Sequence, residues 1–548
     1  MQKKNRFLTG LLSAVMALTL FALPATAAED TETGGTPTVS VSDNWTQETG
    51  SIVIHKYEYN GTNAGKEPTG EATDGNKVPT PDAKALEGAG FTVYQVMTRD
   101  KLAKYYDGYS AETQVKIDTY VEKGKIKSAY EGDQVGSEIK TGSDGVATFG
   151  SLPLGLYVVV ETTTPDKVTT AVDPFLVSIP MTKATTNKEW MYDVNVYPKN
   201  KTTYGGISLV KTGRTGETNN GPLKGVTFIL QKKIKNVWTG INTPDNSTTP
   251  FNLTTGEDGK ITVEGLSQGQ YRFIESSIAG DNSYIIDENP INFTIGADGK
   301  ATYNGETLTT AIPVVNDRPD LNKKVINKAG NPDYIADYSV GDLVPYKITV
   351  TVPQNITRLK TFTVVDTPSG LDDKWNDESF TVKYGDTDVT AGTYSVAQEG
   401  EHGFKVKFNP ETMTAYKGKN IVISYKAELL PTADKTKTGN SNTAKLEYTN
   451  DIKVAEDGET SEGSTKEIHD SAFVYSFKLK VVKTADDKTT PLQNVKFDLY
   501  KEDASGTVTG ATAKALGLDE STTWKKINGT GEPLKTDSKG EISVEGLA

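Results

Sequence analysis

Residues 141–161 read TGSDGVATFGSLPLGLYVVVE, and residues 255–275 repeat the pattern as TGEDGKITVEGLSQGQYRFIE without a gap. A third copy begins with TDSKGEISVEGLA at residues 536–548. In each copy, strand-like alternation follows a D-G or S-K-G turn, which predicts strands joined by hairpins. A calcium-loop interpretation of the turn aspartates is disfavoured, because acidic ligands do not recur at alternate positions. The repeat therefore predicts related β units along the chain.

Two further strand patterns precede each copy of the repeat. One is an apolar strand that ends in lysine: SIVIHKY, ISLVKTG and LKVVKTA. The other contains phenylalanine: GAGFTVYQV, LKGVTFILQ and LQNVKFDLY. A block with longer strands separates the second copy from the third. These patterns predict an all-β chain of tandem immunoglobulin-like sandwiches, and the missing Pro-rich or Ser-rich linkers predict a stiff rod. A short helical insertion is expected over residues 111–127 of the first unit.

The expected domain division follows these patterns. It consists of a signal peptide at 1–28, an N-terminal linker at 29–47, β units at 48–201, 202–318 and 319–470, and a truncated unit at 471–548. The signal peptide has a basic start, an apolar run and the small residues Ala25-Thr26-Ala27, which predicts export.

Composition excludes several classes of function. The chain has no cysteine, so disulfides and metal thiolates are excluded. Its formal charge is −13, without a basic stripe, which argues against nucleic acid as a partner. The three histidines, His55, His402 and His469, are scattered, so we expect no catalytic or zinc site. No metal and no cofactor are predicted.

Strand alternation places a lysine, a carboxylate and an asparagine on the core side of each of the first three units. The predicted sets are Lys56, Glu161 and Asn200; Lys211, Glu275 and Asn316; and Lys323, Asp366 and Asn442. In the third set, Lys324 competes with Lys323, and Asn440 competes with Asn442. Lys483 is expected to point into the core of the last unit, with its asparagine partner beyond the chain end.

Two interpretations of these buried sets are open. One is a buried salt bridge hydrogen-bonded to an asparagine, although such a pair contributes little stability. The other is chemical, because desolvation lowers the pKa of a lysine and raises that of a carboxyl group. A neutral amine could then attack the asparagine carboxamide while the acid polarises it, and ammonia would leave behind a Lys–Asn isopeptide bond. Such a cross-link would replace the missing disulfides.

Residues 190–200, WMYDVNVYPKN, resemble the pilin motif of sortase-assembled backbone pilins of Gram-positive bacteria. YVVVETTTP from Tyr157 and YRFIESS from Tyr271 resemble the E-box of collagen-adhesin B-type domains, and TFTVVDTP at 361–368 resembles the aspartate strand of the A-type domain. The motif residues are Trp190, Val194, Val196, Tyr197, Pro198, Lys199 and Asn200.

The resemblance implies a function and a set of partners. Residues 48–201 would be the N-terminal pilin domain, 202–318 and 471–548 B-type domains, and 319–470 an A-type domain. Lys199 would be the nucleophile that a pilus sortase joins to the next subunit. Lys56–Asn200, Lys211–Asn316 and Lys323–Asn442 would be intramolecular isopeptide bonds promoted by Glu161, Glu275 and Asp366.

The chain would thus be a secreted backbone subunit of a covalent cell-wall pilus with a role in adhesion and colonisation. Its partners would be identical subunits, the sortase, minor pilins and host surface ligands. Its only chemistry would be a single-turnover reaction on itself. Because the family's C-terminal sorting signal is absent up to residue 548, we expect the chain to be a fragment.

Two other classes of protein remain open. An adhesin or minor pilin on a β-sandwich stalk would present a binding insertion, and only residues 99–140 are a candidate for one. A secreted hydrolase would need a cleft with convergent carboxylates or a serine–histidine pair, and the sequence offers little material for either.

Overall fold

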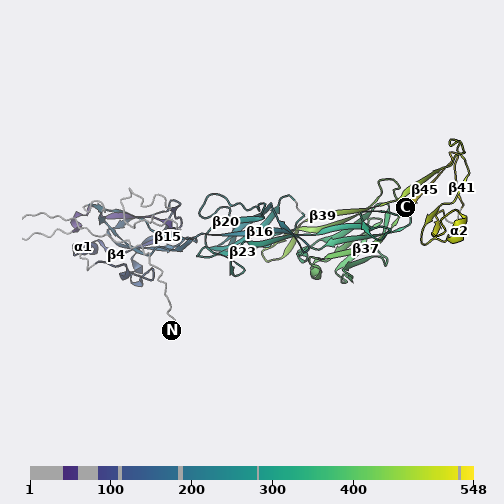
Figure 1. The fold of residues 1–548 in the computed structure, drawn as a ribbon. Coiled ribbons are helices and arrows are strands. Elements are labelled where there is room, and N and C mark those ends of the chain that lie inside the picture. Colours follow the sequence, from purple (N-terminus) through teal and green to yellow (C-terminus); the bar gives the residue numbers. More distant parts are fainter. Residues whose placement is uncertain (1–40, 60–83, 109–113, 183–188, 281–282, 529–531) are drawn as a thin grey trace, which may run out of the picture.

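The structure is a computed structural model that describes residues 41–59, 84–108, 114–182, 189–280, 283–528 and 532–548. The expected signal peptide and most of the N-terminal linker lie outside the described residues. Strands dominate, and β units follow one another along an elongated molecule (Figure 1). Three separate hydrophobic cores hold the first three units together. The prediction of tandem β-sandwiches is confirmed.

The first unit wraps three sheets, ordered β14-β1-β8, β10-β15-β2-β3 and β11-β9-β4-β7, around one core. Its strands are β1 (Thr49–His55), β2 (Tyr57–Tyr59), β3 (Lys84–Ala85), β4 (Gly90–Thr98), β7 (Gln134–Lys140), β8 (Val146–Pro153), β9 (Gly155–Thr163), β10 (Val168–Thr170), β11 (Phe175–Ile179), β14 (Asp193–Val196) and β15 (Lys199–Thr202). Two short pairs are β5 (Val121–Glu122) with β6 (Lys125–Ile126) and β12 (Met181–Thr182) with β13 (Trp190–Met191). The first strands, β1 and β2, run parallel to β14 and β15 near the end of the unit.

The helix of the first unit lies earlier than expected. Helix α1 covers Arg99–Asp107, whereas the described part of 111–127 holds only the 3-10 turn η3 (Ile117–Thr119) and the β5–β6 hairpin. The prediction of a helix over 111–127 was therefore wrong. The Lys123-Gly124 pair explains the difference, since both residues have positive φ and form a hairpin turn that interrupts a helix. Leu102 and Tyr106 of α1 are buried in the first core.

The second unit packs a four-stranded sheet against a six-stranded one. Its strands are β16 (Gly205–Thr215), β17 (Thr218–Pro222), β18 (Val226–Ile234), β19 (Val237–Gly240), β20 (Lys260–Leu266), β21 (Gly269–Ile278), β23 (Ile291–Ile295), β24 (Ala301–Tyr303), β25 (Glu306–Thr307) and β26 (Ile312–Arg318). The first strand, β16, again pairs in parallel with the last, β26. Strand β22 (Ile286–Asp287) leaves this unit and pairs with β38 of the third.

The third unit is a sandwich of two long sheets, ordered β29-β39-β38-β31-β36-β35 and β28-β27-β30-β37-β33-β34. Its strands are β27 (Asp320–Ile326), β28 (Pro332–Asp333), β29 (Ile335–Asp337), β30 (Leu343–Thr351), β31 (Phe362–Pro368), β32 (Leu371–Lys374), β33 (Thr381–Tyr384), β34 (Thr387–Asp388), β35 (Tyr394–Glu399), β36 (Gly403–Phe408), β37 (Asn420–Leu429), β38 (Asn440–Val454) and β39 (Thr460–Tyr475). Strand β32 pairs with β37, and β39 continues past residue 470.

The last unit consists of short strand pairs. They are β40 (Phe477–Val482) with β45 (Glu541–Leu547), β41 (Lys496–Phe497) with β44 (Leu534–Lys535) and β42 (Tyr500–Glu502) with β43 (Trp524–Lys526), beside helix α2 (Gly510–Ala515). Short 3-10 turns elsewhere are η1 (Val41–Asn44), η4 (Ser128–Asp133), η5 (Ile356–Arg358) and η6 (Pro410–Tyr416).

The repeated turn glycine has the same structural role in all three copies of the repeat. Gly145, Gly259 and Gly540 have φ values of +76°, +70° and +70°, which favour glycine. An added Cβ would lie only 2.3–2.5 Å from the carbonyl oxygen of the lysine of the same unit, Lys56, Lys211 or Lys483. That lysine donates its backbone N–H to the carbonyl oxygen of the same glycine, at 2.8 Å in each copy. The repeat thus fixes the backbone of this lysine against the turn.

Candidate functional site

The first cluster joins side chains from the two ends of the first unit. Lys56 lies between β1 and β2, Asn200 lies on the adjacent strand β15, and Glu161 reaches them from β9 of another sheet. The side chains of all three are covered. Lys56 Nζ donates to Asn200 Oδ1 at 2.6 Å and to Glu161 Oε2 at 3.0 Å. Asn200 Nδ2 donates to Glu161 Oε1 at 2.5 Å. One carboxylate therefore contacts both the amine and the carboxamide.

The second cluster repeats this geometry. Lys211 on β16 and Asn316 on β26 lie on neighbouring parallel strands, and Glu275 faces them from β21. Lys211 Nζ donates to Asn316 Oδ1 at 2.5 Å and to Glu275 Oε2 at 3.0 Å. Asn316 Nδ2 donates to Glu275 Oε1. The three residues are at most 2% exposed, so the cluster is dry.

Burial changes the proton affinity of these groups. Desolvation lowers the pKa of Lys56 from 10.5 to about 8, although Glu161 opposes the shift. The pKa of Lys211 is lowered by the same cause, and burial raises the pKa of Glu275. An aromatic ring lies beside each amine: the Phe91 ring centroid is 5.4 Å from Lys56 Nζ, and the Phe228 ring centroid is 5.8 Å from Lys211 Nζ. The lowered pKa leaves more of the Lys56 amine uncharged, and so nucleophilic, at neutral pH than is the case for an exposed lysine.

The third cluster bridges the two sheets of its sandwich. Lys323 comes from β27 of one sheet, and Asp366 on β31 and Asn442 on β38 come from the other. All three are completely buried. Lys323 Nζ donates to Asn442 Oδ1 at 2.7 Å and contacts Asp366 Oδ1. Because β39 follows β38, Asn442 lies on the penultimate strand rather than the last one.

The geometry shows which of the competing lysines and asparagines belong to the third cluster. Lys324 Nζ lies over the Tyr334 ring, 2.9 Å from its centroid and outside the cluster. Asn440 is buried, but its carboxamide accepts from the Asp434 N–H and donates to the Asp434 and Val474 carbonyl oxygens. Lys323 and Asn442 are therefore the pair that meets.

Two residues of the third cluster were not foreseen from the sequence. Tyr425 Oη accepts from Lys323 Nζ at 2.8 Å and donates to Asp366 Oδ2 at 2.5 Å. Asp373 Oδ1 accepts from Asn442 Nδ2 at 3.1 Å. The burial of Asp373 could have been predicted from the sequence, because Asp373 lies two residues after the buried Leu371 on the same strand, β32.

Lys483 departs from the prediction that it points into a core. Its side chain is exposed, as is Val482, and Leu479 is 38% exposed. Among the described residues, β40 pairs with β45 alone, and no second sheet covers the face that Lys483 shares with Leu479. Its backbone nevertheless repeats the contact with the turn glycine Gly540.

The 190–200 motif ends at Asn200, which is a member of the first cluster. Val194, Val196, Tyr197, Pro198 and Asn200 are buried, whereas Lys199 is partly exposed. Lys199 opposes Tyr57 in the parallel β15–β2 pair.

Aromatic contacts hold both ends of this motif in place. Tyr197 stacks on the His55 ring with centroids 4.8 Å apart. Trp190 packs edge-on against Trp45, with centroids 5.8 Å apart. The motif therefore presents the Lys199 side chain on the face opposite to the Asn200 carboxamide.

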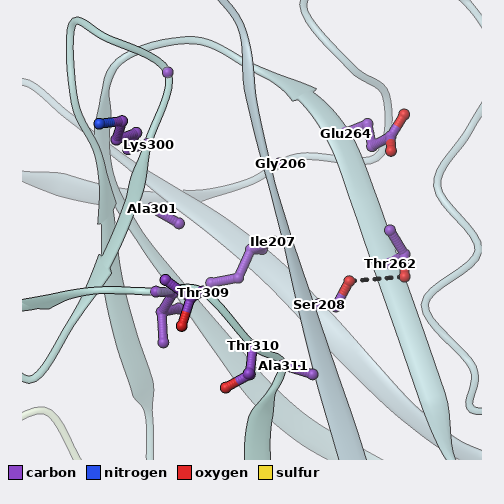
Figure 2. A pocket seen from close by; sticks show the side chains of 12 residues that line it. Gly206, Ile207, Ser208, Thr262, Glu264, Lys300, Ala301, Thr309, Thr310 and Ala311 are labelled. Carbon is purple, nitrogen blue, oxygen red and sulfur yellow. Dashed lines mark hydrogen bonds between the residues drawn. The ribbon is translucent and has the colours of Figure 1, made fainter.

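A surface hollow of about 460 Å³ lies on the second unit, beside β16 and β20 (Figure 2). Gly206, Ile207, Thr309 and Ala311 line it, and Ser208 and Thr262 are hydrogen-bonded to each other at 2.9 Å. Its lining holds no histidine and no pair of carboxylates, which is unsuited to hydrolysis. Among the described residues, no group of three or more His, Cys, Asp or Glu side chains could hold a metal ion.

Residues 47–201 match the family of the Gram-positive pilin subunit D1, N-terminal domain. This segment is a pilin domain. Residues 206–307 match the prealbumin-like fold domain. The resemblance to Gram-positive pilins is confirmed, and neither matched family is an enzyme family. The first cluster and the 190–200 motif both belong to the pilin domain.

Fimbrial subunits are among the similar proteins. The chain is 32% identical over 189 residues to the type 1 fimbrial subunit of Actinomyces viscosus, a match that covers 34% of this chain and 32% of that protein. It is 30% identical over 198 residues to the type 2 subunit of Actinomyces naeslundii, covering 33% of each. The matches thus span about a third of these relatives. Among solved structures, the Bacillus cereus major pilin subunit BcpA matches with 20% identity and a TM-score of 0.40, over 63% of this chain and 85% of that one.

No helix in the described ranges is long and apolar enough to cross a membrane.

Proposed function

We propose that this chain is a structural backbone subunit of a covalently polymerised pilus on a bacterial cell wall. The observation that carries the proposal is the pairing, within a pilin domain, of a buried Lys56–Glu161–Asn200 cluster with a partly exposed lysine at the next position, Lys199. A pilus sortase joins the Lys199 amine to the C-terminal sorting signal of another copy. The buried cluster strengthens the domain that transmits tension through this linkage.

In the proposed internal reaction, each cluster forms one isopeptide bond. The lysine Nζ attacks the asparagine side-chain carbonyl carbon, the Nζ–C bond forms and the C–Nδ2 bond breaks. One proton passes from Nζ to Nδ2, so that ammonia leaves. Glu161 and Glu275 relay this proton in the first two units, because each already contacts both nitrogens. Asp366 contacts the lysine in the third.

The proposed domain boundaries follow these bonds: 48–201, 202–318, 319–470 and 471–548. The subunit is exported to the cell wall, where its partners are further copies of the chain, the sortase, minor pilins and host surface ligands. The closed first three units form the shaft, on which adhesion and colonisation depend.

Intact-mass measurement of the mature chain tests the internal bonds. Three bonds remove three ammonia molecules from the calculated mass. Glu161→Ala, Glu275→Ala and Asp366→Ala should each restore one ammonia and leave the other two bonds in place. A mass equal to that of the unmodified sequence would leave the buried salt bridge as the correct interpretation.

A further inference from the structure

The third cluster distributes its acidic contacts differently from the other two. In the first two clusters, one glutamate accepts from both the lysine amine and the asparagine carboxamide. In the third, Asp366 contacts the amine of Lys323 and accepts from Tyr425, whereas the carboxamide of Asn442 donates to Asp373 Oδ1 and to Tyr425 Oη, at 3.1 Å each. Aspartate is one methylene shorter than glutamate, so Asp373 and Tyr425 make the contacts to the carboxamide that one glutamate makes elsewhere.

Asp373 is a second buried carboxyl group within this cluster. It lies on β32 and is 4% exposed. Its Oδ1 accepts from Asn442 Nδ2, while its buried Oδ2 has no hydrogen-bond donor within reach. The negative charge of Asp366, in the same cluster, raises the pKa of Asp373. Two like charges so close disfavour each other, so this arrangement favours one protonated and one ionised carboxyl group.

We propose that Asp373 is a catalytic residue of the third isopeptide bond and delivers the proton to the departing nitrogen of Asn442. This inference rests on the proposed internal cross-links. Asp366 takes a proton from Lys323 Nζ, Nζ bonds to the Asn442 side-chain carbonyl carbon, and the C–Nδ2 bond breaks. Asp373 protonates Nδ2 as ammonia leaves. The proton held by Asp366 then restores the carboxyl pair, so atoms and charges balance.

The groups around Asp373 favour its protonated form. Burial and the negative charge of Asp366 on β31 raise the pKa of Asp373, and Lys323 on β27 opposes the shift. Tyr346 on β30 and Tyr425 on β37 also face this pair, and burial raises the pKa of both phenols, so they stay uncharged. The carboxamide of Asn442 on β38 completes the enclosure. Asp373 can therefore hold a proton at neutral pH, as an acid for the leaving group must.

Variants of the full mature chain separate catalysis from packing. Asp373→Asn keeps the size of the side chain but has no acidic proton, and Asp373→Glu restores one. Peptide mass mapping of the Lys323–Asn442 cross-link over time should show at least a tenfold slower reaction in Asp373→Asn, which corresponds to a barrier higher by about 1.4 kcal/mol or more. Asp373→Glu should recover a large part of the rate.

The neighbouring Asp372 provides the matched control. It lies partly exposed on the same strand and pairs with Lys374 at 2.5 Å and His402 at 3.0 Å. Asp372→Asn should therefore form the third bond as the parent chain does. The inference is overturned if Asp373→Asn reacts at the parental rate, or if Asp373→Glu is as slow as Asp373→Asn, which would indicate a packing role. A parent chain that loses no ammonia would instead refute the proposed cross-links themselves.

Discussion

Lys199 and Asn200 are consecutive residues of β15 whose side chains lie on opposite faces of the strand. Asn200 is completely buried against Lys56 and Glu161, whereas Lys199 is partly exposed and opposes Tyr57. The period of two along a strand produces this separation. One strand can thus serve an internal bond on its core face and an external bond on the other. The proposed function requires both.

Glu161→Gln separates two roles of the carboxylate. The negative charge of Glu161 raises the pKa of Lys56, so its removal should leave more of the amine neutral. If a neutral amine were sufficient, the variant would react faster. Because Gln cannot relay the proton to Nδ2, we expect the first bond to be lost or slowed about a hundredfold or more. Peptide mapping of the Lys56–Asn200 cross-link measures the rate, and faster formation would refute the relay.

The first bond should stabilise its unit by constraining the unfolded chain. Lys56 and Asn200 are 144 positions apart, so the proposed bond would close nearly the whole first unit into a loop. By the chain-entropy account, such closure contributes about 4–5 kcal/mol. Glu161→Ala should therefore melt at a lower temperature and be cut by trypsin sooner within residues 48–201. Unchanged protease resistance in a chain shown to lack the bond would contradict a structural role.

Without the Lys56–Asn200 bond, the free energy of unfolding of the first unit should increase with pH in the alkaline range. Asn200→Ala cannot form the cross-link but keeps Lys56 buried beside Glu161. The pKa of Lys56 is about 8 when folded and 10.5 in its ordinary state, so between these values the unfolded chain binds more protons. The free energy of unfolding should therefore rise with pH across this window, by up to about 3 kcal/mol.

Pulse proteolysis in urea at a series of pH values measures this rise. The double variant Lys56→Met, Asn200→Ala is the control, because it lacks the buried amine and should not show the Lys56 contribution. Equal pH profiles for the two chains would show that Lys56 keeps its ordinary pKa in the folded unit.

Strand alternation correctly predicted that the lysines of the three clusters are buried. The parity of the first strand determines that Lys56 shares a face with Ile52 and Ile54, and the lysine is indeed completely buried. The same reasoning holds for Lys211 and Lys323, because two-sided sandwiches enforce the pattern. Parity fails at Lys483, where no described second sheet covers the strand.

Contacts that depend on side-chain length and loop path could not be predicted in this way. To predict that Asp366 and Asp373 share these contacts, one must know that β32 pairs with β37, in the sheet that faces the sheet of β38. The position of α1 was missed because its buried residues, such as Leu102 and Tyr106, gain their stability from packing rather than from helix propensity.

Gly259→Ala should displace the backbone of Lys211 and so disturb the second cluster, although Gly259 is not a member of it. The glycine has φ +70°, and an added Cβ would lie 2.3 Å from the Lys211 carbonyl oxygen. Relieving that contact must shift the β16 backbone at Lys211, so we expect a loss of about 1–3 kcal/mol in stability and slower bonding of Lys211 to Asn316. Gly305→Ala is the control, since its φ is also positive and no atom lies within 4 Å of the added Cβ. Equal effects would mean that backbone strain alone, and not the contact with Lys211, slows the bond.

Replacing Lys199 should abolish polymerisation while leaving the internal bond intact. The chain is incubated with the cognate pilus sortase and a peptide that carries its sorting signal, and the modified residue is located by peptide mass mapping. We expect the label on Lys199. Lys199→Ala should not be labelled, and Lys199→Arg should also fail because guanidinium stays protonated and is a poor nucleophile.

Lys201 provides the matched control on the same strand. It lies two residues further along β15, on the same face as Lys199, and is more exposed. If exposure alone selected the amine, Lys201 would be labelled first, and Lys201→Ala would reduce the yield. We expect Lys201→Ala to react like the parent chain, because the enzyme must recognise the 190–200 motif that surrounds Lys199. Labelling that persists in Lys199→Ala, or falls on scattered lysines, would favour an adhesin or minor pilin on a β-sandwich stalk over a backbone subunit.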